Sequence, residues 1–543
     1  MKHDPHRPPS TAERNKRATV VAAALCLFTG IASSTPAHST AIQTTPVPEF
    51  GAAFETRSAE AGRIAALIAN HEFDKALALS DEMIKSAPNR SPGYNLQGTA
   101  YLGKRDVASA RKSFEQALKV EPGNPIALVN LAHLDMQQKD ADGARKRFQA
   151  VLSKDSRNID AMLGMAQLDY QKGDAKAGFA WLEKAKAARP EAIDPRLNIA
   201  AFHMRRNNFA QAIMELNEGT RTHADHPELL NLLGLAQMGA GQNDTAVATF
   251  RRLVAARPDA PLSYFRLATA QIGAGAFAQA SESLTRALKI NPDYIDALVA
   301  QAGLEVRAKR YADALKIARQ VQAIPSAASG GLVLEGDVLL AQEQHADAAK
   351  VYERAFAASP SGVVVTKLHT VLSRAGNTKD ANAALERWMK DHPNDVTVLH
   401  YAAAEELRQG EPKAAMGRYQ QILAREPQDV VAMNNLASLY QQAGDARALG
   451  LAETAYKLNP ESPVVSDTLG WILVGQGKTA RGMKLLESAL AREPNNPEIR
   501  YHVAAARAKA GDKAVARREL EALLASGQPF SQREAAQALL KQL

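Results

Sequence analysis

Apolar residues recur at helical spacing in two short blocks within residues 91–124. The first block runs from Tyr94 to Leu102 and the second from Val107 to Val120. This spacing predicts two amphipathic helices joined by a short turn. Because isolated helices shorter than about 12–15 residues are marginal in water, each helix must pack against a neighbour. The pattern therefore predicts a helical hairpin that is stable only as part of a stack.

The same block recurs along the chain with a period of about 34 residues. Prolines mark the end of most periods, at Pro88, Pro122, Pro190, Pro258, Pro292, Pro325, Pro360, Pro393, Pro427, Pro460 and Pro494, whereas Ser156, Ala224 and Gln528 stand at the other ends. A small residue stands twelve places before each period ends, in the series Ala76, Ala110, Ala144, Gly178, Ala212, Ala246, Ala280, Ala314, Ala348, Ala381, Ala415, Ala448, Gly482 and Ala516. Chance does not place so many small residues in one register, even in an alanine-rich chain. The series predicts a close helix crossing in every repeat, which a larger side chain would overpack.

Glycine or asparagine recurs at the predicted turn inside the repeats. The members are Gly173, Asn207, Gly241, Gly275, Gly376, Gly410, Gly477 and Gly511. Both residue types adopt the left-handed conformation that ends a helix, so the series predicts turns as well as packing. An acidic or amide residue follows the glycine at Asp174, Asn377, Asp445 and Asp512, and these residues are predicted to cap the next helix.

Seven residues of the 91–124 stretch carry a family resemblance. Tyr94, Gly98, Tyr101, Ala110, Phe114, Ala117 and Pro122 fall where the tetratricopeptide (TPR) pattern places its aromatic, glycine, alanine and proline residues. The stretch therefore resembles one TPR unit. The resemblance implies an all-α TPR solenoid, a right-handed superhelix of about fourteen helix-turn-helix repeats with a C-terminal capping helix.

A repeat array lets 543 residues form one elongated solenoid, because each unit contacts only its neighbours. The solenoid is predicted over residues 57–530. The register slips near residues 325–331, which indicates either a bend or a harmless longer turn. Residues 531–543 are predicted to form the capping helix, opened by a capping box between Ser531 and Glu534.

The N-terminus has a basic segment followed by the apolar run from Ala18 to Ala32. This pattern is typical of a secretory signal peptide over residues 1–37, followed by a Thr/Pro-rich flexible linker over 38–56. Two alternatives stay open, namely an uncleaved membrane anchor and a lipid on Cys26, the single cysteine, although Leu25 before it departs from the usual lipid-attachment pattern. The expected location is exported and periplasmic.

The C-terminal half resembles a narrower group. The resemblance rests on non-consensus stretches at residues 334–342, 387–395, 434–449, 467–477 and 495–530. These are similar to the TPR-repeat lipoproteins of the PEP-CTERM/exosortase system, over roughly residues 291–543. That family is linked to envelope loci that sort proteins by a C-terminal PEP signal and make exopolysaccharide, and it has no assigned enzymatic activity.

Catalytic chemistry is not indicated by any motif. No catalytic residue, metal ligand or cofactor is predicted, and His223 and His226 are expected to lie on a solvated loop. The formal net charge of +8 is a mild excess for so long a chain. A local basic cluster comprises Arg507, Lys509, Lys513, Arg517 and Arg518. It lacks the interleaved aromatic residues that nucleic-acid binding uses, so no nucleic-acid partner is expected. The basic residues indicate either a solvated face or a site for an anionic polysaccharide.

The first helix of each TPR unit lines the ligand-binding side in the family, so the resemblance implies a set of partner-binding residues. They are Asn95, Thr99, His133, Asn198, Asp337, His400, Asn434, Asp467, Trp471 and Tyr501. The alternative is that some of these residues pack between helices. The predicted function is an exported protein-interaction scaffold of the bacterial envelope, serving exopolysaccharide production or PEP-CTERM protein sorting. Direct binding of an anionic glycan, or a role as a non-catalytic regulatory subunit of a polysaccharide synthase, is the alternative.

Overall fold

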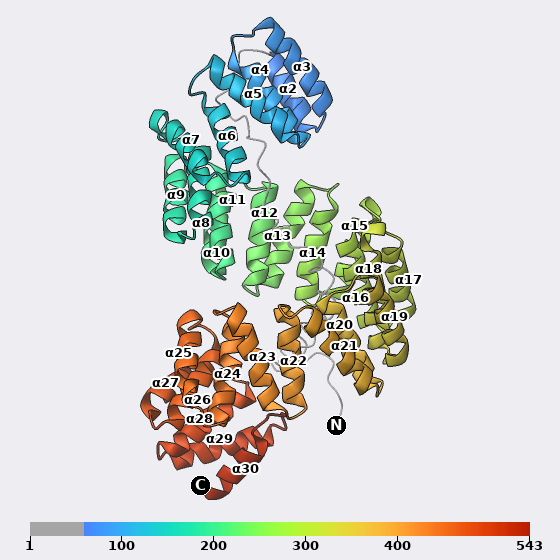
Figure 1. Ribbon diagram of the computed structural model, residues 1–543, viewed down its shortest axis with the longest axis vertical. Helices are drawn as coiled ribbons and strands as arrows, with labels where there is room; N and C mark the ends of the chain where they lie inside the picture. Colours follow the sequence, from blue (N-terminus) through green and yellow to red (C-terminus); the bar gives the residue numbers. More distant parts are fainter. Residues whose placement is uncertain (1–58) are drawn as a thin grey trace, which may run out of the picture. The chain divides into compact units, whose positions relative to one another are not determined.

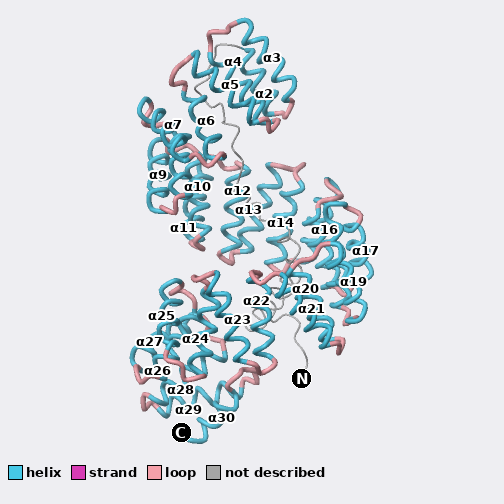
Figure 2. Tube along the Cα trace, viewed as in Figure 1, coloured by secondary structure: helices cyan, strands magenta, loops and turns pink. Residues whose placement is uncertain are grey.

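The computed structural model describes residues 59–543, and this part of the chain is built from α-helices and one 3-10 helix without a strand (Figures 1 and 2). The predicted signal peptide, the linker and Cys26 lie outside the described residues. The chain divides into two compact units at Ala327–Ala328.

The first unit holds eight helix pairs. They are α2 (Ala59–Ala69) and α3 (Phe73–Ser86), α4 (Ser91–Gly103) and α5 (Val107–Val120), α6 (Pro125–Gln137) and α7 (Ala141–Lys154), α8 (Ile159–Gln171) and α9 (Ala175–Ala188), α10 (Ile193–Arg205) and α11 (Phe209–Thr222), α12 (Pro227–Gly239) and α13 (Asn243–Ala256), α14 (Pro261–Gly273) and α15 (Phe277–Ile290), and α16 (Ile295–Arg307) and α17 (Tyr311–Gln322). The 3-10 helix η2 (Pro325–Ala327) follows.

The second unit holds six pairs and a last helix. They are α18 (Ala328–Ala341) and α19 (His345–Ala358), α20 (Gly362–Arg374) and α21 (Thr378–Asp391), α22 (Val396–Arg408) and α23 (Pro412–Arg425), α24 (Val430–Gln442) and α25 (Arg447–Leu458), α26 (Pro463–Gly475) and α27 (Thr479–Arg492), α28 (Pro497–Lys509) and α29 (Lys513–Ala525), and finally α30 (Arg533–Gln542).

Fourteen helical hairpins therefore make up α2 to α29, and the predicted all-α TPR fold is confirmed. Within each unit a helix packs on the next one in sequence, and first helices also contact the first helix of the following pair, as α10 does with α12 and α24 with α26. All fourteen members of the small-residue series are buried. The series is thus buried in every repeat, as the predicted helix crossing requires.

The turns inside the repeats have the predicted left-handed backbone. The φ angles of the predicted series run from 57° at Asn207 to 93° at Gly511. Five other repeats place a non-glycine residue at this left-handed position, namely His71, Arg105, Lys139, Lys309 and Glu343. Of the four predicted caps, only Asp174 is confirmed. It accepts a capping hydrogen bond from the Ala177 N–H at 2.9 Å. Asn377 and Asp512 make none, and Asp445 stands one residue before the cap position.

Helix α30 covers the end of the second unit. Ala536 is fully buried against Leu520 and Leu523 of α29, with Leu539 and Leu540 packed beside it. The predicted capping box at its start does not form, because the N-cap residue is Gln532. Ser531 instead donates from its backbone N–H and its hydroxyl to Glu498 of α28, at 2.6 and 3.1 Å. This pairing replaces a local cap with a bond to the preceding repeat.

Gly330 and Gly331, where the register slips, lie inside α18. The bend predicted near residues 325–331 remains a prediction. Among the described helices, no single one is both long enough and apolar enough to cross a membrane, although the broken pair Tyr311–Gln322 and Pro325–Ala341 meets those criteria of length and composition when taken together.

Candidate functional site

The ten predicted partner-binding residues all lie on first helices of the repeats. Six of them are buried, namely Asn95, Thr99, Asp337, Asn434, Asp467 and Tyr501. His133, His400 and Trp471 are half-buried, and Asn198 is exposed. Burial alone does not decide their role, which depends on the contacts that each side chain makes.

Asp337 lies on α18 and contacts residues of α19 and α20. Its carboxylate accepts hydrogen bonds from the Tyr352 hydroxyl at 2.5 Å and from the Lys367 ammonium at 2.6 Å. Burial raises the pKa of Asp337, and the neighbouring Lys367 opposes that rise. Burial also raises the pKa of Tyr352. Lys367 therefore links α20, the first helix of its repeat, to α18, the first helix of the preceding repeat.

Tyr401 makes the equivalent connection from α22 back to α20. Its hydroxyl lies 2.8 Å from Nδ1 of His369 and 2.9 Å from the Thr370 hydroxyl. Burial raises the pKa of Tyr401. The phenol is thus held as a neutral hydrogen-bonding group between two first helices.

His400 connects α22 forward to α24. Its Nε2 lies 2.9 Å from the carboxylate of Asp429, which also caps α24 by accepting the Ala432 N–H at 2.7 Å. Burial raises the pKa of Asp429, but the hydrogen bonds from Ala432 and His400 outweigh it and leave this pKa below its ordinary value.

Asp467 on α26 pairs with His502 on α28. The Nδ1 atom of His502 lies 2.8 and 3.0 Å from the two carboxylate oxygens. The Trp471 ring stacks on the His502 ring, with centroids 4.5 Å apart and planes 16° apart, and the Lys509 ammonium lies 5.5 Å from the Trp471 ring centre. The Trp471 ring therefore contacts two residues of α28.

These contacts join residues 29 to 35 positions apart and link successive first helices. We call this set the polar ladder of the second unit: Asp337, Lys367, His369, Tyr401, His400, Asp429, Asp467 and His502. Of these eight residues, only Asp337, His400 and Asp467 are among the predicted partner-binding residues. The signal that could have found the others is a pair of complementary polar residues about one repeat length apart on two first helices.

The remaining predicted residues make weaker or more local contacts. In the first unit Asn95 donates to the side chain of Asn124, the cap of α6, at 3.1 Å, and Thr99 donates to the Asn95 carbonyl. The His133 ring meets Phe148 edge-on, and burial lowers the pKa of His133. Asn198 donates to the backbone of Asp194, four residues earlier.

Asn434 and Tyr501 complete the set in the second unit. The amide oxygen of Asn434 is buried without a hydrogen-bond partner, as is that of Asn95 in the first unit. Burial raises the pKa of Tyr501, whose ring packs near Phe530 at 6.2 Å between centroids.

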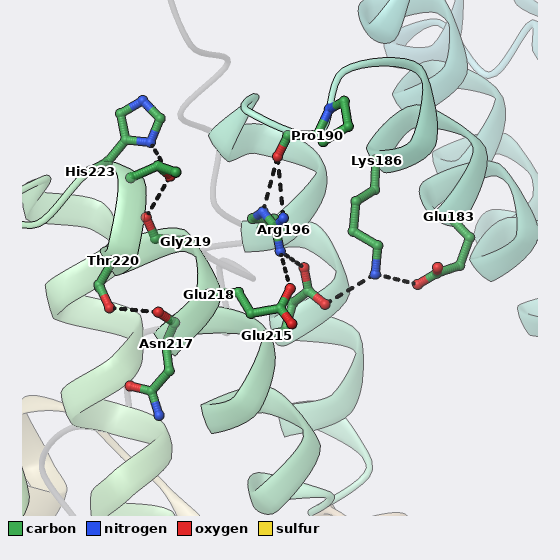
Figure 3. Close-up of polar contacts among 11 residues, drawn as sticks. Glu183, Lys186, Pro190, Arg196, Glu215, Asn217, Glu218, Gly219, Thr220 and His223 are labelled. Atoms are coloured by element: carbon green, nitrogen blue, oxygen red, sulfur yellow. Dashed lines mark hydrogen bonds and ion pairs between the residues drawn. The ribbon is translucent and has the colours of Figure 1, made fainter.

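A second charged network lies in the first unit, between α9, α10 and α11. Figure 3 shows Arg196 and Lys186 converging on Glu215 from two sides, at 2.7 and 3.1 Å. Arg196 also binds Glu218 at 2.9 Å and the Pro190 carbonyl, and Lys186 binds Glu183. Sequence reasoning missed this network. Its signal is Arg196, which stands where the first helix of residues 91–124 has Tyr94.

The C-terminal basic cluster is partly neutralised. Arg507 pairs with Glu519 and, at 3.5 Å, with Glu487, and Lys509 lies over Trp471. Across residues 59–543 no group of three or more His, Cys, Asp or Glu side chains is arranged to hold a metal ion.

Family models of the tetratricopeptide repeat match this chain in several places. One matches residues 101–155, 135–191, 237–302 and 473–543, and a second matches 202–261. The matches agree with the hairpins described above.

Two bacterial proteins are similar over part of the chain. The TPR repeat-containing protein PA4667 of Pseudomonas aeruginosa is 31% identical over 136 residues, which are 24% of this chain and 22% of that protein. The cellulose synthase 2 operon protein C of Komagataeibacter xylinus is 30% identical over 156 residues, 28% of this chain and 12% of that one. The chain thus spans less than a quarter of the length of either relative.

A solved structure is similar over a larger share of the chain. The crystal structure of yeast Tom70 has a TM-score of 0.42 and 14% identity, with 78% of this chain and 96% of that chain covered.

Proposed function

We propose that this chain, which is a tetratricopeptide-repeat protein, acts as a non-catalytic protein-interaction scaffold. The observation that carries the proposal is the polar ladder. Its members bond from one first helix to the next, as Asp337 does with Lys367 and Asp467 with His502. A face held by such bonds is organised before any partner arrives. A partner segment that docks on it would then lose less of its binding energy to ordering the protein side.

We further propose that the scaffold is exported and works in the bacterial envelope. Support comes from the apolar run near the N-terminus and from the resemblance to PEP-CTERM-associated TPR lipoproteins. The similarity to a protein named for a cellulose synthase operon supports a role beside polysaccharide production or export. The PEP-CTERM association stays a prediction.

A regulatory subunit of a polysaccharide synthase is the second candidate, and the same similarity favours it. Direct glycan binding through the C-terminal basic cluster has less support, because Glu487 and Glu519 pair with Arg507.

Site-specific photocrosslinking in cells tests the scaffold. A crosslinking residue replaces Asn198 or Thr397, which are exposed on the first helices α10 and α22, and the control replaces Lys119, exposed on the second helix α5. We expect one defined protein adduct from the first-helix positions and none from the control. Adducts of equal yield at all three positions, or none anywhere, would contradict the proposal. N-terminal sequencing of the mature chain from fractionated cells tests export, and an uncleaved cytoplasmic chain would refute it.

A further inference from the structure

A cavity of about 340 Å³ lies in the second unit, between the end of α21, the start of α22 and the helix α23. The residues that line it are Glu386, Met389, Lys390, Pro393, Leu399, Arg418, Gln421 and Arg425. Most of them come from the second helices α21 and α23. The cavity is therefore formed by different residues from those of the polar ladder.

The lining combines an apolar part with positive charge. Leu399 is buried, and the half-buried Met389 packs on the same hydrophobic core. Three of the eight lining residues are cationic and one, Glu386, is anionic. An apolar surface beside unpaired cations favours an amphipathic anion, whose charge and aliphatic part are satisfied together.

Two of the three cations form no ion pair with any residue that the structure describes. Arg418 donates from Nε to Glu406 at 2.9 Å, so its charge is balanced. Arg425 donates from Nε to the neutral side chain of Asn394, and from Nη1 to the Gln421 carbonyl at 3.4 Å. Among the described residues no carboxylate forms an ion pair with Arg425 or Lys390. The cavity therefore retains positive charge for a ligand.

We propose that this cavity binds an acidic side chain of a protein partner, with an adjoining aliphatic residue of that partner on Met389 and Leu399. The inference rests on the proposed scaffold function and adds the chemistry of one docking segment. The lining favours a peptide over a sugar, because none of its eight residues offers an aromatic face on which a sugar ring could stack. Methionine suits an aliphatic side chain, since its flexible thioether adapts to irregular shapes.

Fluorescence anisotropy on the full chain tests the proposal. The probe is a labelled octapeptide of alternating leucine and glutamate, and the matched probe has glutamine in place of glutamate. We expect the acidic probe to bind more tightly and its affinity to fall as salt is raised. The double variant K390Q/R425Q should weaken binding by about tenfold or more, because charge-assisted hydrogen bonds are lost.

Arg492→Gln is the matched control. Arg492 ends α27 as Arg425 ends α23, and it binds Glu461 of the preceding inter-repeat loop as Arg425 binds Asn394, but it lies outside the cavity lining. Thermal unfolding should shift to a similar degree in R425Q and R492Q, whereas only the cavity variants should lose the probe.

Three results would overturn the proposal: no binding of the acidic probe, equal binding of the glutamine probe, or equal loss in R492Q. Tighter binding of trigalacturonate than of the acidic peptide, abolished by K390Q/R425Q, would reassign the cavity to a glycan and also overturn it. Failure here leaves the crosslinks from Asn198 and Thr397 unaffected, so the cavity and the scaffold function are tested separately.

Discussion

A Cβ atom added at Gly482 would lie 2.6 Å from the carbonyl oxygen of Gly470, so the backbones of α27 and α26 are in direct contact. Gly482 belongs to the small-residue series, and here even alanine is too large because the obstacle is backbone. This contact shows in one repeat why the series exists.

Gly482→Ala should therefore destabilise the second unit by about 1–3 kcal/mol through overpacking. Gly417 is the matched control, because it also lies within a second helix and a Cβ there would meet nothing within 4 Å. Gly417→Ala should instead stabilise by about 0.5–1 kcal/mol. Urea unfolding followed by circular dichroism measures both, and equal effects of the same sign would refute the steric account.

At the turns inside the repeats, replacing a non-glycine residue by glycine is expected to stabilise the fold. Lys139 has φ of 64°, which strains any residue with a Cβ, so Lys139→Gly should stabilise the first unit by about 1 kcal/mol. At Gly241, with φ of 75° and open space around the added Cβ, Gly241→Ala should destabilise by a similar amount. The test compares thermal unfolding midpoints. Stabilisation by G241A would show that backbone strain is not the cause.

The charged network of Figure 3 predicts a strong asymmetry between two acids that share Arg196. Glu215→Ala should destabilise by about 1–3 kcal/mol, because Glu215 is 8% exposed and its loss removes the partner that Arg196 and Lys186 share. Glu218 has a side chain 51% exposed, so Glu218→Ala should change stability by less than about 1 kcal/mol. Chemical denaturation measures the stability of the two variants. Equal losses of stability would contradict the larger role given to Glu215.

Glu405 is expected to contribute to the loss of folding stability at low pH. A hydrogen bond from Arg408 is the main cause that lowers the pKa of Glu405 from 4.5 to about 2. Because the folded-state pKa lies below the unfolded one, the contribution is fully present above about pH 4.5 and is lost as the pH falls towards 2. The unfolding midpoint of Glu405→Gln should therefore fall less steeply than that of wild type across this range. Parallel midpoint curves would rule the contribution out.

Much of the fold could be predicted from the sequence, because the same steric requirements recur in every repeat. The series from Ala76 to Ala516 and the turn glycines recur at one spacing, and each follows from a steric need of a single hairpin. The capping box at Ser531 failed for a related reason, since local spacing does not show that Glu498, 33 residues earlier, binds Ser531.

The candidate site could be predicted only in part. Helical spacing placed Asp337, His400 and Asp467 on first helices, and the structure finds them there. The spacing could not show that Lys367, Asp429 and His502 bind these three side chains. Such pairs depend on the rotation and tilt of neighbouring first helices, which no local pattern contains.

The sequence by itself thus determined the hairpin, its period and the small residue at each crossing, because these follow from sterics and hydrophobic spacing within one repeat. Only the tertiary structure decided which polar groups are paired and which are left for a ligand. Lys390 and Arg425 lie 35 residues apart in the chain and line one cavity only because α21 and α23 pack around the start of α22. Ion pairs are set by approach in space, and that approach is decided when the repeats stack.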